Sequence, residues 1–124
     1  MAQPFPDARP TISTHVLDTG SGRPAAGVQV TLSKLGDDGR PIRMTQALTD
    51  GDGRVRDLLE RPLVAGVYRL EFSLGPSGPA LDDAAAGSRF FERIAIDVRI
   101  DDVDRSHHVP LLLAPYSVTS YRGS

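Results

Sequence analysis

Alternation of apolar and polar side chains with a period of two is the feature that most constrains what this chain can fold into. Successive side chains of a β-strand point to opposite faces, so this period indicates a strand with one buried face. The longest such run spans 90–100, and its inward-facing side chains are Ile94, Ile96, Val98 and Ile100. Further strands are predicted at 11–17, 27–35, 41–48 and 67–74, and in two runs after residue 106.

Turns and one helical candidate complete the predicted architecture. Polar segments rich in glycine and aspartate, such as 18–24 and 36–39, separate the strands. The segment 80–86 carries alanine and acidic residues and is predicted to form a short helix. Helices do not alternate with the strands, as they would in a parallel α/β domain. The pattern therefore predicts an all-β fold, an antiparallel β-sandwich of about eight strands with one short helix.

The length of the chain sets the number of domains. At 124 residues it can bury one hydrophobic core but not two. Three prolines indicate that residues 1–10 form a flexible lead-in, and residues 11–124 are predicted to form the single domain. The first ten residues lack the apolar stretch of a secretory signal, so we expect a cytoplasmic protein.

Charge and residue type exclude several classes of function. The formal net charge of −2 provides no basic field to hold nucleic acid or an anionic membrane. No run approaches the ~20 apolar residues of a membrane span. The chain has no cysteine, which excludes disulfides and thiol catalysis and leaves histidine and carboxylates as the ligands for any metal.

The three histidines, His15, His107 and His108, are the first candidates for chemistry. A lone histidine on a strand is more often structural or simply exposed than catalytic. His107 and His108 are neighbours, so on a strand they point to opposite faces and at most one of them serves a given site. A zinc site that combines His15, one of this pair and a carboxylate has no support from the spacing, and we predict no metal.

The polar loop 49–54 contains the sequence Asp-Gly-Asp-Gly and invites a calcium interpretation. In the register of an EF-hand loop, however, the first and twelfth positions fall on Leu48 and Leu59, which carry no ligand oxygen on their side chains. A turn that directs Arg54 is the better interpretation. By spacing alone, Arg54 reads as an ordinary surface arginine.

The carboxyl end is predicted to be held in place, although chain ends are usually polar and frayed. Two strand-like runs, separated by a turn at Pro115, lead directly to Tyr121-Arg122-Gly123-Ser124. The tyrosine, arginine and serine of this tetrapeptide bring hydrogen-bonding groups, and the glycine allows tight backbone geometry. A terminus built in this way is positioned for a function.

Four motifs, in chain order, resemble those of the transthyretin-like 5-hydroxyisourate hydrolases. They are Ile12-Ser13-Thr14-His15-Val16-Leu17-Asp18 with 22–28, the loop 49–54, the strand 66–70, and 108–116 with the tetrapeptide 121–124. The resemblance covers residues 11–124. Each motif is weak by itself, whereas four in order are specific.

The resemblance implies a fold, an assembly and a reaction. The fold is an eight-stranded, two-sheet sandwich with one short helix, and the assembly is a homotetramer, a dimer of dimers with active sites in a channel between dimers. The reaction is the hydrolytic ring opening of 5-hydroxyisourate to 2-oxo-4-hydroxy-4-carboxy-5-ureidoimidazoline, a cyclic amide hydrolysis in urate degradation. No cofactor is implied.

The resemblance also assigns residues. The implied catalytic residues are His15, Arg54, His108 and Ser124. The implied substrate-binding residues are His15, Arg54, Tyr121, Arg122 and Gly123. The histidines would handle water and proton, with either one as the base, while Arg54 and Tyr121 hold the substrate ring.

Two other functions are possible for such a sandwich. One is a non-catalytic carrier of a small ligand on the same fold, and the other is a structural module. The fold alone does not decide between a hydrolase and a carrier. The combination of His15, Arg54 and His108 with the terminal tetrapeptide favours the hydrolase.

Overall fold

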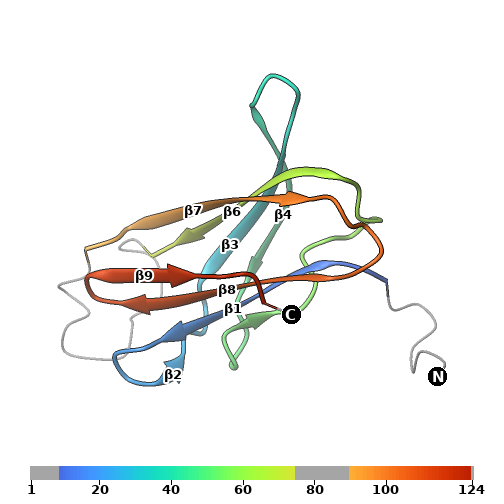
Figure 1. The fold of residues 1–124 in the computed structure, drawn as a ribbon. Coiled ribbons are helices and arrows are strands. Elements are labelled where there is room, and N and C mark those ends of the chain that lie inside the picture. Colours follow the sequence, from blue (N-terminus) through green and yellow to red (C-terminus); the bar gives the residue numbers. More distant parts are fainter. Residues whose placement is uncertain (1–8, 75–89, 124) are drawn as a thin grey trace, which may run out of the picture.

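The computed structural model describes residues 9–74 and 90–123 (Figure 1). In that part of the chain the strands are β1 (Ile12–Asp18), β2 (Arg23–Pro24), β3 (Gln29–Leu35), β4 (Pro41–Leu48), β5 (Arg54–Val55), β6 (Gly66–Ser73), β7 (Arg93–Ile100), β8 (His107–Ala114) and β9 (Ser117–Ser120). The predicted all-β fold is confirmed. The predicted helix at 80–86 and most of the predicted lead-in 1–10 lie outside the described residues.

The strands form two stacked sheets (Figure 1). One sheet has the order β4-β3-β6-β7 and is antiparallel throughout. The other has the order β2-β1-β8-β9, and β5 pairs with β1 beside β2. One pair departs from the predicted antiparallel pattern, because β1 and β8 run parallel from the Ile12–His107 pair to the Asp18–Leu113 pair. This pair joins the beginning of the domain to its end.

Strand positions agree with the sequence prediction within a few residues, with two informative differences. The predicted strand 90–100 begins at Arg93, so its first residues stay outside the ladder. The loop 49–54 leads into a strand that the pattern did not include, since β5 pairs with β1 through Arg54 and Val55, after which Leu58 and Leu59 turn into the core.

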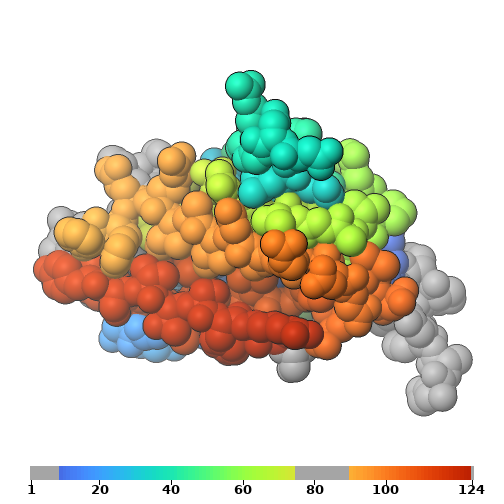
Figure 2. Space-filling model, turned by 45° about the horizontal axis from the view of Figure 1, so that its top comes forward, coloured from blue at the N-terminus to red at the C-terminus, as the bar shows by residue number. Residues whose placement is uncertain are grey.

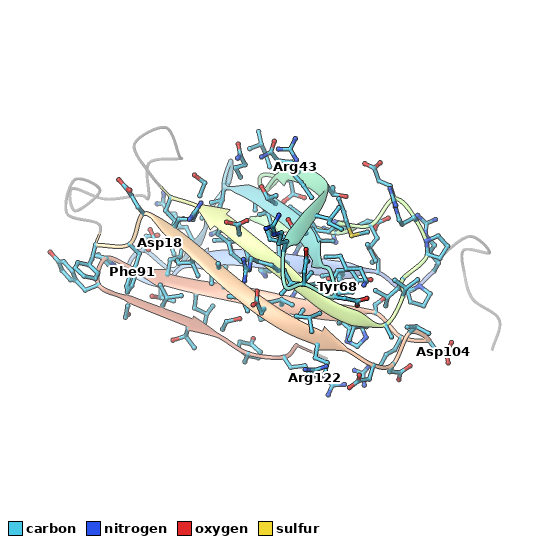
Figure 3. All side chains as sticks on the ribbon, turned by 90° about the horizontal axis from the view of Figure 1, so that it is seen from above. Asp18, Arg43, Tyr68, Phe91, Asp104 and Arg122 are labelled. Carbon is cyan, nitrogen blue, oxygen red and sulfur yellow. The ribbon has the colours of Figure 1, made fainter. Side chains whose placement is uncertain are left out.

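The core lies between the sheets and gathers the alternating apolar side chains of both. Its largest fully buried members include Tyr68, Phe72, Ile12, Leu32, Leu58, Leu59, Leu70, Ile100, Leu111 and Leu113. Tyr68 is fully buried inside the sandwich, whereas Arg122 lies at its margin (Figure 3). The Tyr68 hydroxyl donates a hydrogen bond of 2.7 Å to the carbonyl of Val64 and accepts one of 3.3 Å from its N–H.

The edge strand β7 is less buried than its sequence pattern predicts. Ile94, Ile96 and Val98 point to the core side as expected, but each remains partly accessible, and only Ile100 is buried. Among the described strands, none pairs with the outer edge of β7, so the described part of the chain covers the core thinly there. Figure 2 shows β7 and the carboxyl-terminal strands side by side along one face. Within the described ranges, no helix has the length and apolar character needed to span a membrane.

Tyr68→Phe is expected to lower the free energy of unfolding by about 1 kcal/mol, because the polar groups of Val64 lose a partner while the buried ring stays in place. Urea unfolding at a fixed protein concentration measures the change. Tyr116→Phe is the matched control, since Tyr116 is 70% exposed. Equal stability of the two variants would contradict the role given to the Tyr68 hydroxyl.

Candidate active site

Three side chains from three strands meet on one sheet face. In β1, Thr14 and Val16 are buried toward the core, so His15 between them points to the outer face. β5 pairs antiparallel with β1 and places Arg54 directly opposite His15. β8 pairs parallel on the other side of β1, and His108 precedes the buried Val109. The outer face of this sheet therefore carries His15, Arg54 and His108 together.

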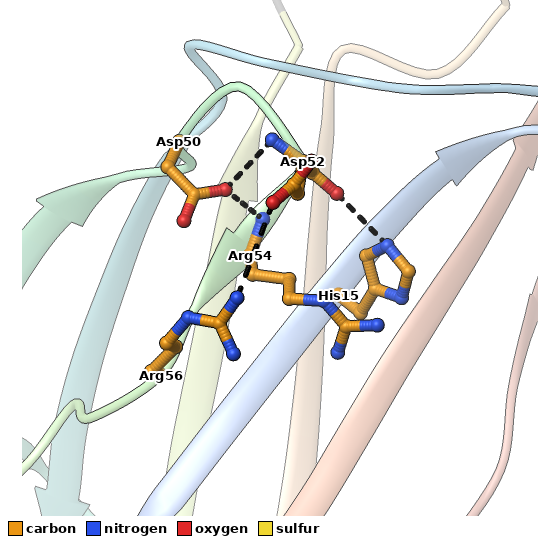
Figure 4. Close-up of polar contacts among 5 residues, drawn as sticks. All are labelled: His15, Asp50, Asp52, Arg54 and Arg56. Atoms are coloured by element: carbon orange, nitrogen blue, oxygen red, sulfur yellow. Dashed lines mark hydrogen bonds and ion pairs between the residues drawn. The ribbon is translucent and has the colours of Figure 1, made fainter.

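The loop before Arg54 is a tight turn that closes on itself and on β1. One carboxylate oxygen of Asp50 accepts hydrogen bonds of 2.9 Å from the backbone N–H groups of both Asp52 and Arg54 (Figure 4). The bond from Arg54 is the main reason that the pKa of Asp50 lies below its usual value. Gly53 adopts φ +77° and its carbonyl accepts a 2.7 Å bond from the N–H of Val16. The interpretation of this loop as a turn that directs Arg54 is correct.

His15 is oriented by the same turn. Its Nε2 lies 2.9 Å from the backbone carbonyl oxygen of Asp52. A carbonyl can only accept, so Nε2 carries the hydrogen and donates it. When His15 is neutral, its lone pair is therefore on Nδ1. The guanidinium of Arg54 extends toward the His15 ring on the same side of the sheet (Figure 4).

His108 is held at the other side of β1. Its Nδ1 lies 2.8 Å from the hydroxyl oxygen of Ser13, and its backbone carbonyl accepts a 2.8 Å bond from the N–H of Gly123. Burial lowers the pKa of His108 below its ordinary value, and the charges of Arg54 and His15 lower it further. The lowered pKa favours the neutral form of the His108 imidazole.

The carboxyl-terminal tail runs beside this cluster. Tyr121 and Arg122 line, together with His108, an open cleft of about 490 Å³ between the β7 edge and the second sheet. A second, shallower hollow of about 650 Å³ contains His15 and Arg54. Tyr121 is 58% exposed and Gly123 is buried against His108. Ser124, the remaining predicted site residue, lies outside the described residues.

The His107 side chain lies apart from the cluster, because adjacent residues of a strand point to opposite faces. Its Nε2 lies 2.7 Å from the backbone carbonyl of Asp102, in the turn before β8. Among the described residues, no group of three or more histidine, aspartate or glutamate side chains is placed to hold a metal ion. The cluster brings together two imidazoles and a guanidinium.

Two residues of the cluster were not found from the sequence. Ser13 contacts His108, and the backbone of Asp52 contacts His15. The signal for Ser13 is its spacing, because residues two apart on a strand share a face and Ser13 stands two before His15. The shared face becomes informative only when β8 is known to pair with β1, and the sequence pattern does not reveal that pairing.

The family model described as HIUase/Transthyretin matches residues 12–123, which is almost the whole described domain. The chain belongs to this family. The resemblance of its four motifs is thereby confirmed.

The chain is similar both to 5-hydroxyisourate hydrolases and to a transthyretin. A 5-hydroxyisourate hydrolase of Caulobacter vibrioides is 40% identical over 114 residues, covering 91% of this chain and 97% of the relative. The structure of a Klebsiella pneumoniae 5-hydroxyisourate hydrolase has a TM-score of 0.75 at 36% identity, with 93% and 99% of the two chains covered. Sea bream transthyretin, solved in complex with thyroxine, has a TM-score of 0.73 at 27% identity, with 90% and 93% covered.

Gly53→Ala is expected to lower the free energy of unfolding by at least about 1 kcal/mol and to displace the turn that holds His15 and Arg54. A Cβ at this position would collide with the carbonyl of Val16 and would require a side chain at φ +77°. Gly51→Ala in the same turn is the control, because its Cβ would meet open space. Urea unfolding and a crystal structure of each variant measure both effects. A Gly53→Ala variant as stable as Gly51→Ala would show that the turn is not constrained as described.

Proposed function

We propose that this protein hydrolyses 5-hydroxyisourate to 2-oxo-4-hydroxy-4-carboxy-5-ureidoimidazoline, a step of urate degradation. The observation that carries the proposal is the convergence of His15, Arg54 and His108 on one sheet face from three separate strands. The substrate is proposed from the Caulobacter and Klebsiella relatives, which are 5-hydroxyisourate hydrolases. The site itself supplies a neutral imidazole, a second imidazole and a fixed positive charge, which fit the addition of water to an acyl carbon.

The proposed mechanism divides the work between proton transfer and substrate binding. A neutral imidazole takes a proton from water as its oxygen attacks the ring acyl carbon, and the ring C–N bond then breaks with protonation of the leaving nitrogen. Arg54 donates forked hydrogen bonds to substrate oxygens and stabilises the negative charge that develops there. Tyr121, Arg122 and Gly123 contribute donors beside His108, and Ser124 is proposed to complete that wall.

A non-catalytic carrier is the alternative that shares this fold. The sea bream transthyretin structure is as similar in backbone as the hydrolase structure, so the fold does not separate the two functions. The side chains favour catalysis, because His108 is held neutral and His15 has a defined donor nitrogen within one cluster. An apolar carrier site would need neither feature.

We also propose that the functional unit is a homotetramer, a dimer of dimers. The cluster lies on the outer face of a sheet that no other part of the described chain covers, so a second copy is needed to close the site around substrate. Apolar side chains share this face, with Leu17 and Leu112 partly exposed beside the cluster. The thinly covered edge at β7 offers a second contact surface. The cytoplasmic location stays a prediction from the sequence.

His15→Ala and His108→Ala should each lower the turnover of freshly prepared 5-hydroxyisourate by about 10²- to 10⁴-fold, the usual contribution of a general acid or base. Decay of the ultraviolet absorbance of the substrate measures the rate. His107→Ala is the matched control, because His107 lies on the neighbouring position of the same strand and contacts Asp102 instead. Near-normal rates in both site variants would reject the assignment, and a wild-type rate no faster than uncatalysed decay would favour the carrier.

Sedimentation equilibrium should give the wild-type protein the mass of four chains. Leu112→Asp should reduce that mass, because it puts a charge on the sheet face proposed to be covered by another copy. Gln46→Glu is the control, since Gln46 lies on the outer face of the opposite sheet beside Thr31. A monomeric wild-type protein at micromolar concentration would overturn the proposed assembly.

A further inference from the structure

Among the described residues, Ser13 supplies the side chain that lies within hydrogen-bond distance of a ring nitrogen of His108. The parallel register of β1 and β8 pairs Ser13 directly with His108, and the hydroxyl oxygen lies 2.8 Å from Nδ1. Neighbouring strands lie about 4.8 Å apart, so a short side chain on one strand reaches the ring atoms nearest the backbone of the other. Nδ1 is bonded to Cγ and is within that reach, whereas Nε2 is on the far side of the ring.

Gly123 occupies the other side of the same ring. A Cβ added at Gly123 would lie 2.7 Å from Cδ2 of His108 and 3.1 Å from Cγ, too close for any side chain. The backbone of Gly123 is fixed there by its hydrogen bond to the carbonyl of His108. Nδ1 and Cδ2 are the two ring atoms bonded to Cγ, so Ser13 and Gly123 contact opposite edges of the imidazole.

We propose that Ser13 is a positioning residue of the active site, which together with Gly123 fixes the His108 ring so that Nε2 faces the substrate. This inference rests on the proposed function and deepens it, since it states which nitrogen of His108 performs the proton transfer. A serine hydroxyl can donate or accept, and here we assign the hydrogen to Nδ1, which donates it to the hydroxyl oxygen and leaves the lone pair of neutral His108 on Nε2. Without the hydroxyl, the ring can turn about its Cβ–Cγ bond and exchange tautomers.

The charges around His108 explain why a fixed ring matters here. Arg54 on β5 and His15 on β1 both face the His108 side chain, and Tyr121 and Arg122 follow on the tail. The charges of Arg54 and His15 disfavour a protonated His108, so the ring is proposed to function in its neutral form. A neutral imidazole has one donor and one acceptor nitrogen, and only one orientation presents the required nitrogen to substrate.

The test compares Ser13→Thr with Ser13→Val, two side chains of the same shape that differ in the hydroxyl. Ser13→Thr should retain kcat within about 2-fold, whereas Ser13→Val should lose about 10- to 100-fold in kcat with a smaller change in KM, because a misplaced catalytic group affects the transition state. Both variants accept the strand conformation, since β-branched residues favour it. Equal kcat in the Thr and Val variants would overturn the proposal.

Nitrogen-15 NMR of the imidazoles gives a second measurement that does not depend on turnover. The Nδ1 and Nε2 shifts of His108, assigned with His108→Ala, should show one tautomer in the wild-type protein and in Ser13→Thr, and a mixture or the other tautomer in Ser13→Val. The shifts of His107 should be the same in all three. Unchanged His108 shifts in Ser13→Val would overturn the proposal. If the wild-type protein does not hydrolyse 5-hydroxyisourate, the proposed function fails, and the NMR comparison still decides whether Ser13 fixes the ring.

Discussion

The parallel pairing of β1 with β8 is the interaction on which the rest of the site depends. It joins residues 95 apart in sequence, with Ser13 beside His108 and His15 beside Pro110. Both strands bury their core-side residues completely at Ile12, Val16 and Leu111, so a slip of one residue would turn the apolar set outward. The hydrophobic core therefore fixes the register, and the register fixes which polar side chains meet on the outer face.

The turn 49–54 extends this order to a third strand. Its backbone is bonded to β1 through Gly53 and Val16, while the Asp52 carbonyl holds His15. β5 has only two residues in the ladder, which is too little pairing to position a side chain by itself. The hydrogen bonds of Asp50 to the backbone of the turn supply the missing rigidity. Arg54 is consequently placed by loop chemistry, whereas both histidines are placed by strands.

Local sequence patterns predicted most of the fold because the period of two is a property of each strand alone. The strand assignments, the buried alternation of β6 and the opposite directions of His107 and His108 all follow from it. Pairing partners are a property of two segments, and no residue of β1 indicates that β8 lies beside it. For that reason the pattern alone left Arg54 as an ordinary surface arginine, and Ser13 went unnoticed. The motifs identified the family and so supplied the grouping of His15, Arg54 and His108, but not the contacts that hold them.

The exposure of the cluster distinguishes this site from one enclosed by a single chain. An arginine and two imidazoles on an open sheet face are partly accessible to water, whose high dielectric constant weakens each electrostatic interaction. The same three groups covered by a second copy would act in a drier environment, where a preorganised donor contributes far more to the stabilisation of an oxyanion. Partial burial already lowers the pKa of His108, and covering by a second copy would lower it further. In the proposed homotetramer, assembly and catalysis would therefore be coupled through one physical quantity, the exclusion of water from a face whose side chains each chain has already oriented.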